Sequence, residues 1–196
     1  RGKSVSNQPK HLFCFGLGFS GQALARLGLS KGWRVSGTVR SAEKAARLRE
    51  TGIDALVLDA ATTQALSPEI VTALRSSTHI LQSVGTAKSG HDTVLPLLQP
   101  HAGSLAPQWV GYLSTTVVYG DWQGALVDET SETRSTSSRG LSRLAAESAW
   151  ADFGWPLHIF RLAGIYGPGL HGLVTVQQGR ARIIDKPEQV FSRSHV

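Results

Sequence analysis

The chain has 196 residues, a formal net charge of +6 and a hydrophobic content of 41%, values typical of one globular domain with a full core. The single Cys14 excludes a disulfide framework and a cysteine-based zinc site, and the scattered histidines lack metal-ligand spacing, so no metal is expected. No apolar run is long enough to span a bilayer. The basic residues neither run together nor interleave with aromatic residues, which disfavours nucleic acid as a partner.

Residues 1–9 are polar and are predicted to form a disordered or processed segment. They lack the apolar core of a secretory signal, so no such signal is expected there. The expected compartment is the cytoplasm. The alternative is an organelle stroma or matrix, in which case the basic, Ser-rich start is the remnant of a transit segment.

The first predicted strand, His11–Phe15, leads into the glycine-rich turn Gly16–Gly21, and a helical pattern follows over Gln22–Ser30. A strand, such a turn and a helix in this order form the pyrophosphate site of dinucleotide-binding proteins. Gly16 allows the tight turn. Gly18 lets the backbone approach the phosphates, and Gly21 lets the helix pack closely on the strand. Phe19 and Ser20 complete the predicted cofactor-binding turn, where the helix N-terminus faces the anion.

The end of the second predicted strand, Arg34–Val39, indicates which dinucleotide binds. An NAD site usually has Asp or Glu there to hold the ribose 2′-hydroxyl, and this chain has Thr38 and Arg40 instead. An Arg can pair with a 2′-phosphate, so NADP is predicted over NAD. The alternative is that Arg40 is a solvated charge at the start of the next helix.

Apolar runs and helical patterns alternate along the rest of the chain, which predicts an α/β fold with a doubly wound parallel sheet. Asp59 ends the third predicted strand and is a candidate acceptor for the adenine amino group, with a turn role as the alternative. The further strands are expected over Ala55–Leu58, His79–Val84, Trp109–Leu113 and Leu157–Leu162, and the further helices over Ala42–Glu50, from Ser67, over Thr93–Leu98 and over Leu141–Trp150.

Three groups of segments resemble the extended and atypical short-chain dehydrogenase/reductases, in particular the members related to nucleotide-sugar epimerases. The resemblance implies a Rossmann domain over 10–170, followed over 171–196 by the start of an incomplete C-terminal substrate lobe. It also implies oxidoreductase or epimerase chemistry on a nucleotide-linked or similar small polar substrate. The segments are Gly16–Gly21 with Gly37–Arg40, Leu113–Asp121 with Asp128–Thr130, and Arg161–Gly169.

The resemblance implies three catalytic positions, and this chain departs from the family at two of them. Thr115, four positions before Tyr119, matches the Ser or Thr that orients the substrate oxygen. Arg139 and Arg143 stand where the family has its Tyr and Lys. A guanidinium keeps its proton, so Arg139 cannot act as a general acid or base. Arg143 can still donate a hydrogen bond to a ribose or a phosphate.

An NADP-dependent enzyme and a dinucleotide-binding sensor or structural subunit therefore both remain open, as does a nucleic-acid-associated protein of this fold supported by charge alone. Tyr112 and Tyr166 are expected to lie too far from the Arg139 helix to be assigned a role. Apolar residues near the end are expected to face water and to mark contact with a protein partner or a second copy. They are Leu170, Leu173, Val174, Val176, Ile183, Ile184, Val190 and Phe191.

Overall fold

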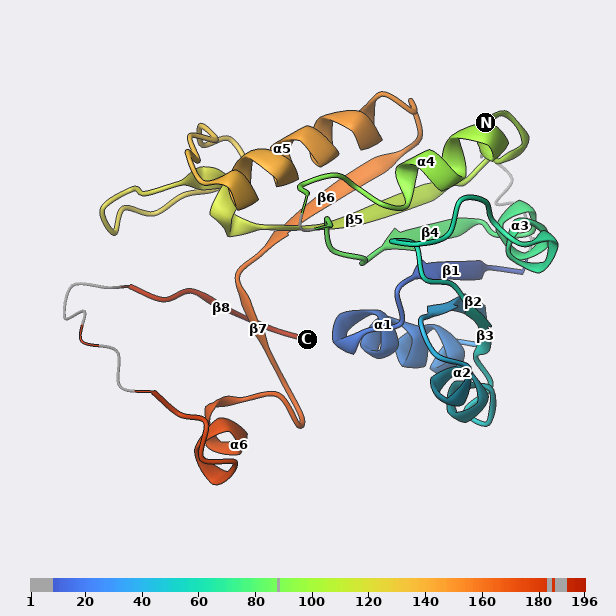
Figure 1. Ribbon diagram of the computed structural model, residues 1–196, viewed down its shortest axis with the longest axis horizontal. Coiled ribbons are helices and arrows are strands. Elements are labelled where there is room, and N and C mark those ends of the chain that lie inside the picture. The colour runs from blue at the N-terminus through green and yellow to red at the C-terminus, as the bar shows by residue number, and fades with distance from the viewer. Residues whose placement is uncertain (1–8, 88, 183–184, 186–189) are drawn as a thin grey trace, which may run out of the picture.

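Figure 1 shows the computed structural model of the protein, which describes residues 9–87, 89–182, 185 and 190–196. The predicted N-terminal segment 1–9 therefore lies outside the described residues, apart from its last position. The central sheet consists of β1 His11–Phe15, β2 Arg34–Val39, β3 Asp54–Val57, β4 His79–Gln82, β5 Trp109–Thr115 and β6 Leu157–Leu162. Its strands are all parallel and lie in the order β3-β2-β1-β4-β5-β6, which confirms the predicted doubly wound sheet.

Helices lie on both faces of this sheet. Their bounds are α1 Phe19–Ser30, α2 Ala42–Arg49, α3 Pro68–Arg75, α4 Leu95–Leu98 and α5 Ser138–Ala151, with short 3-10 turns η1 Gln99–Ser104 and η2 Thr116–Tyr119. In Figure 1, α1 and α2 lie below the sheet, and α3, α4 and α5 lie above it.

Strand β1 contributes to two hydrophobic cores, because successive side chains of a strand point to opposite faces. Leu12 and Cys14 belong to the core under α1 and α2, while Phe13 and Phe15 belong to the core under α3, α4 and α5. All four are almost fully buried, as the near-continuous apolar run predicted. Burial raises the pKa of the Cys14 thiol to about 12, so this cysteine behaves as a small neutral core residue.

The loop after β4 is anchored by one carboxylate. Asp92 accepts hydrogen bonds from the backbone N–H groups of Val94 and Leu95, from Nε1 of Trp150 at 3.0 Å and from Nε2 of Gln82 at 3.2 Å. The expected strand to Val84 ends at Gln82, whose Oε1 accepts from the Val84 N–H and turns the chain. The expected helix from Thr93 likewise begins later, at Leu95.

A polar centre joins β5, α5 and β6. The Glu147 carboxylate accepts from Ser114 Oγ at 2.5 Å and from Arg161 Nη2 at 2.8 Å, and Arg161 Nη1 donates to Tyr119 Oη at 3.2 Å. The hydrogen bond to Glu147 raises the pKa of Arg161 above its usual value. Strand β5 also runs two residues longer than expected, because Ser114 and Thr115 pair with β6.

After β6 the chain leaves the sheet and forms β7 Gly164–Tyr166, α6 Gly172–Gln177 and β8 Arg193–His195, with β7 and β8 paired in parallel (Figure 1). Ile183 and Ile184 lie outside the described residues. Within the described part, no helix is long and apolar enough to cross a membrane, and no group of three or more His, Cys, Asp or Glu residues could hold a metal ion. The apolar residues Leu170, Leu173, Val176, Val190 and Phe191 are exposed, and Val174 is half-buried.

Replacing Glu147 with Ala should destabilise the fold, because it leaves the Arg161 guanidinium without its carboxylate in a largely buried place. The expected loss is about 3 kcal/mol in the free energy of unfolding. Urea denaturation would measure this loss. The control is Glu132→Ala, at an exposed position in the loop before α5, which should leave the midpoint unchanged. Equal midpoints for the two variants would show that the polar centre contributes little to stability.

Candidate functional site

The order of the strands reverses between β1 and β4, since the chain goes from β1 outward to β3 and from β4 outward to β6. The loops that follow these two strands diverge there, and doubly wound proteins bind ligands in the resulting crevice. A cavity of about 840 Å³ lies at this place. It is lined by the glycine turn after β1, the start of α2, residues 58–61 after β3 and residues 83–87 after β4.

The glycine turn is packed so closely that side chains are excluded at two of its positions. Gly16 has a φ of +83°, and its carbonyl accepts a hydrogen bond from Ser83 Oγ at 2.6 Å. A Cβ on Gly21 would lie 2.5 Å from that same carbonyl oxygen. Gly18 differs, because a Cβ there would meet no atom within 4 Å and would extend into open space at the cavity wall.

Helix α1 begins at this turn, and its N-terminus has no side-chain cap. Gly18 is its N-cap and supplies no capping side chain, and no acidic residue stands in its first turn. The first N–H groups of a helix have no partners within the helix and attract anions. The half-buried Phe19 and Ser20 follow in this turn without lining the cavity, and the Phe19 ring packs against the position of Gly167.

Thr38 holds the glycine turn in place. Its Oγ1 accepts a hydrogen bond from the Gly16 N–H at 3.0 Å, and its carbonyl accepts from the Leu17 N–H at 2.8 Å. The residue lines the cavity although it is only 2% exposed. Its side-chain oxygen therefore positions the turn, a task that residue spacing did not reveal.

A basic group gathers where β2 meets α2. Arg40, Ser41 and Lys44 all line the cavity, and Ser41 Oγ accepts from the Lys44 N–H as the N-cap of α2. Lys44 was missed in the sequence, although it stands four positions after Arg40, where the first turn of the capped helix brings it back to the same side. Among the described residues, neither Arg40 nor Lys44 forms an ion pair.

Asp59 also lines the cavity, at the carboxyl end of β3. One of its carboxylate oxygens, Oδ1, accepts a hydrogen bond from the Ala61 N–H at 3.2 Å. The turn role expected for this residue is thus present in the structure. This turn uses one carboxylate oxygen of a residue that lines the cavity, so the two predicted roles are compatible.

A second cavity, of about 440 Å³, shares residues 85–87 with the first and is bounded on its other side by α5. Arg139 and Arg143 both line it. Arg143 Nη1 donates to Tyr112 Oη at 2.9 Å and to the Leu113 carbonyl at 3.3 Å. The fold therefore brings both arginines to the crevice that the glycine turn begins.

The expectation that Tyr112 lies too far from the arginine helix is wrong, because β5 runs directly beneath α5. Burial raises the pKa of Tyr112, and the neighbouring Arg143 opposes this shift. The side chain is fully buried, so its phenol cannot reach a substrate. Tyr166 lies on β7, half-exposed, with its ring edge against His195.

Thr115 stands at the end of β5, half-buried, and lines neither cavity. Its Oγ1 accepts from the Val117 N–H at 3.3 Å and caps η2. The hydroxyl proton remains available to donate, as a group that orients a substrate oxygen requires.

A family model described as "NAD dependent epimerase/dehydratase family" matches residues 16–186. Protein YeeZ of Escherichia coli K12 is 26% identical over 168 residues, which cover 83% of this chain and 61% of YeeZ. A solved structure of a conserved protein of unknown function from Silicibacter pomeroyi DSS is 40% identical, with a TM-score of 0.80, and the match covers 95% of this chain and 64% of that one.

A third similar structure, from Methylobacillus flagellatus, is provisionally described as an NAD-dependent epimerase/dehydratase. It is 25% identical with a TM-score of 0.69, and the match covers 96% of this chain and 66% of that one. The chain thus spans slightly less than two thirds of the length of each of these relatives.

Replacing Gly21 with Ala should destabilise the protein by about 2 kcal/mol, because the new methyl group would overlap the Gly16 carbonyl. Thermal unfolding of the purified variant would measure the loss. Gly103→Ala is the matched control, since a Cβ at that position meets nothing within 4 Å. A Gly21 variant as stable as this control would show that the turn can relax without cost.

Proposed function

The chain belongs to the NAD dependent epimerase/dehydratase family, and on that premise we propose that it binds a nicotinamide dinucleotide in the crevice between β1 and β4. The observation that carries the proposal is the glycine turn, where Gly18 leaves open space in front of the uncapped N-terminus of α1. A pyrophosphate fits such a place, because backbone N–H groups and the helix dipole attract it. The bound dinucleotide supplies hydride exchange at its nicotinamide ring.

We assign a preference for NADP over NAD to the basic group at the end of β2. Arg40 and Lys44 line the cavity wall next to the glycine turn, and the residues directly after β2, Arg40 and Ser41, include no acid to accept a hydrogen bond from a ribose 2′-hydroxyl. A guanidinium and an ammonium together suit a 2′-phosphate. Asp59, farther along the same wall, is our candidate acceptor for the adenine amino group.

Arg139 and Arg143 of α5 stand where the family has Tyr and Lys, and this difference limits the chemistry that the site can perform. Arg139 cannot act as a general acid or base, and the Tyr112 phenol is enclosed in the core. Thr115 remains to polarise a substrate oxygen, with water or another residue as the acid, and Arg143 remains to hold a ribose hydroxyl. We therefore propose that the protein acts as an oxidoreductase or epimerase on a nucleotide-linked or similar small polar substrate. Its turnover rate is expected to be lower than that of family members with the usual Tyr and Lys.

A dinucleotide-binding protein without catalysis, such as a sensor or a subunit of a complex, is the second candidate, and Arg139 at the place of the acid favours it. In both cases we assign residues 10–170 to the dinucleotide-binding domain and 171–196 to the start of a substrate lobe. The exposed apolar side chains of that segment suit contact with a protein partner or a second copy. The buried Cys14 thiol suits a reducing compartment such as the cytoplasm.

NADPH should bind more tightly than NADH, and Arg40→Ala should remove the difference. Loss of one charged hydrogen-bonding partner of a phosphate is expected to weaken NADPH binding about tenfold and to leave NADH binding unchanged. Fluorescence titration of both cofactors would measure this. Arg47→Ala is the control, because that arginine lies on α2, which begins just after Arg40, pairs with Glu43 and does not line the cavity. Equal affinities in the parent protein would refute the NADP assignment.

The double replacement Arg139→Tyr, Arg143→Lys should raise NADPH-dependent turnover of carbonyl substrates by about 10²-fold, because it restores a positioned acid and the cation that tunes it. Steady-state absorbance of NADPH would follow the rate in a protein that includes the whole substrate lobe. Fast turnover in the unmodified protein that Thr115→Ala abolishes would contradict this prediction and show that another acid completes the site.

A further inference from the structure

We propose that Arg139 and Arg143 form a binding site for the carboxylate or phosphate group of a small molecule. The inference builds on the proposed dinucleotide site and concerns the cavity beside it. That second cavity, of about 440 Å³, lies between α5 and the loop after β4. Residues 85–87 line both cavities, so an anionic ligand here would lie at the inner end of the dinucleotide crevice, where a substrate must meet the cofactor.

The Arg143 guanidinium is held in place without being neutralised. Its Nη1 donates to Tyr112 Oη and to the Leu113 carbonyl, and both acceptors are uncharged. A Cβ on Gly85 would lie 3.5 Å from Nη2 of this guanidinium. That distance is an ordinary van der Waals contact, so the Gly85 backbone lies beside Nη2, and among the described residues this nitrogen donates no hydrogen bond. A fixed cation with an open donor edge is suited to bind an oxyanion.

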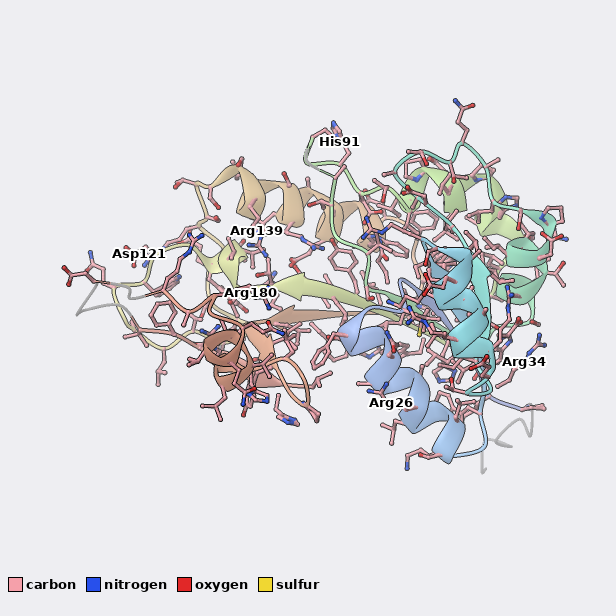
Figure 2. The ribbon with its side chains drawn as sticks, turned by 60° about the horizontal axis from the view of Figure 1, so that its bottom comes forward. Arg26, Arg34, His91, Asp121, Arg139 and Arg180 are labelled. Atoms are coloured by element: carbon pink, nitrogen blue, oxygen red, sulfur yellow. The ribbon has the colours of Figure 1, made fainter. Side chains whose placement is uncertain are left out.

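Arg139 adds a second positive charge one helical turn earlier, on the same face of α5. It is exposed, and among the described residues it forms no hydrogen bond or ion pair. Figure 2 labels it at the N-terminal part of α5. The carboxylate of Glu147, one turn after Arg143, is already occupied by Arg161 and Ser114.

Two like charges one turn apart repel each other. An oxyanion bound between the two guanidinium groups would be attracted by both and would offset their repulsion. The rest of the cavity lining is glycine, alanine, serine and threonine, which leaves room for a ligand and provides hydroxyl groups. None of the described residues that line it is acidic. At the positions where the family has a proton-transferring Tyr and its Lys, this chain thus has two cations that recognise negative charge. The site should therefore bind acidic small molecules more tightly than neutral ones.

Calorimetric titration with inorganic phosphate and with malonate would test this site, first in NADPH-free protein and then in protein saturated with NADPH. Both anions should bind the parent in both states, while malonamide, a neutral molecule of similar shape, should not. Arg139→Ala should weaken anion binding about tenfold, and Arg139→Lys should restore part of the affinity because it keeps the charge. The control Arg47→Ala should bind as the parent does. Because Arg139 has no partner in the described structure, its variants should keep the parent's unfolding midpoint.

Three results would overturn the proposal. The first is that neither anion binds the parent at low ionic strength, and the second is that Arg139→Ala binds both anions as tightly as the parent. The third is that NADPH displaces the anions and Gly18→Ala abolishes their binding, which would place them at the pyrophosphate position. Failure of NADPH to bind would contradict the proposed function alone, because the titration of NADPH-free protein measures the arginine site by itself.

Discussion

The approach of α1 to the carboxyl end of β1 constrains the rest of the nucleotide half of this protein. The contact between Gly21 and the Gly16 carbonyl has no room for a methyl group. Gly37 on β2 is under a similar constraint, because a Cβ there would lie 2.6 Å from the Cys14 carbonyl oxygen. Ser83, directly after β4, and Thr38, from β2, bind the same turn from two sides. Three neighbouring strands thus hold one loop, and this rigidity is what a site built from backbone N–H groups needs.

The other half of the crevice depends on charge rather than on close packing. Glu147 binds Arg161 and Ser114 and so joins α5 to β5 and β6. With the helix held there, Arg143 reaches Tyr112, and the positively charged face of α5 is directed to the loop after β4. Figure 2 shows the contrast with Arg34, which stands at the amino end of β2, far from Arg139. There Arg34 pairs with Asp54, and burial together with Arg34 lowers the pKa of His11.

These two halves of the crevice are built independently, so the proposed dinucleotide site does not depend on which residues stand on α5. The glycine turn and the basic group where β2 meets α2 line the first cavity, whereas the two arginines of α5 line the second. Substitutions on α5 alter the part of the crevice beyond residues 85–87, where the two cavities meet. The binding of a dinucleotide and the reaction performed with it are therefore physically separable in this fold.

Local patterns in the sequence determined the strands, the sheet class and the glycine turn, because apolar runs and glycine spacing express constraints between near neighbours in the chain. The bounds of β1, β2 and β6 follow directly from those runs. Only the tertiary structure determined the contacts between residues that lie far apart in the chain. Thr38 supports a turn 22 residues earlier, Tyr112 meets Arg143 31 residues later, and Lys44 joins the wall of the cavity. No periodicity encodes such distances, since they are set by the order of strands in the sheet and by the direction each side chain takes from it.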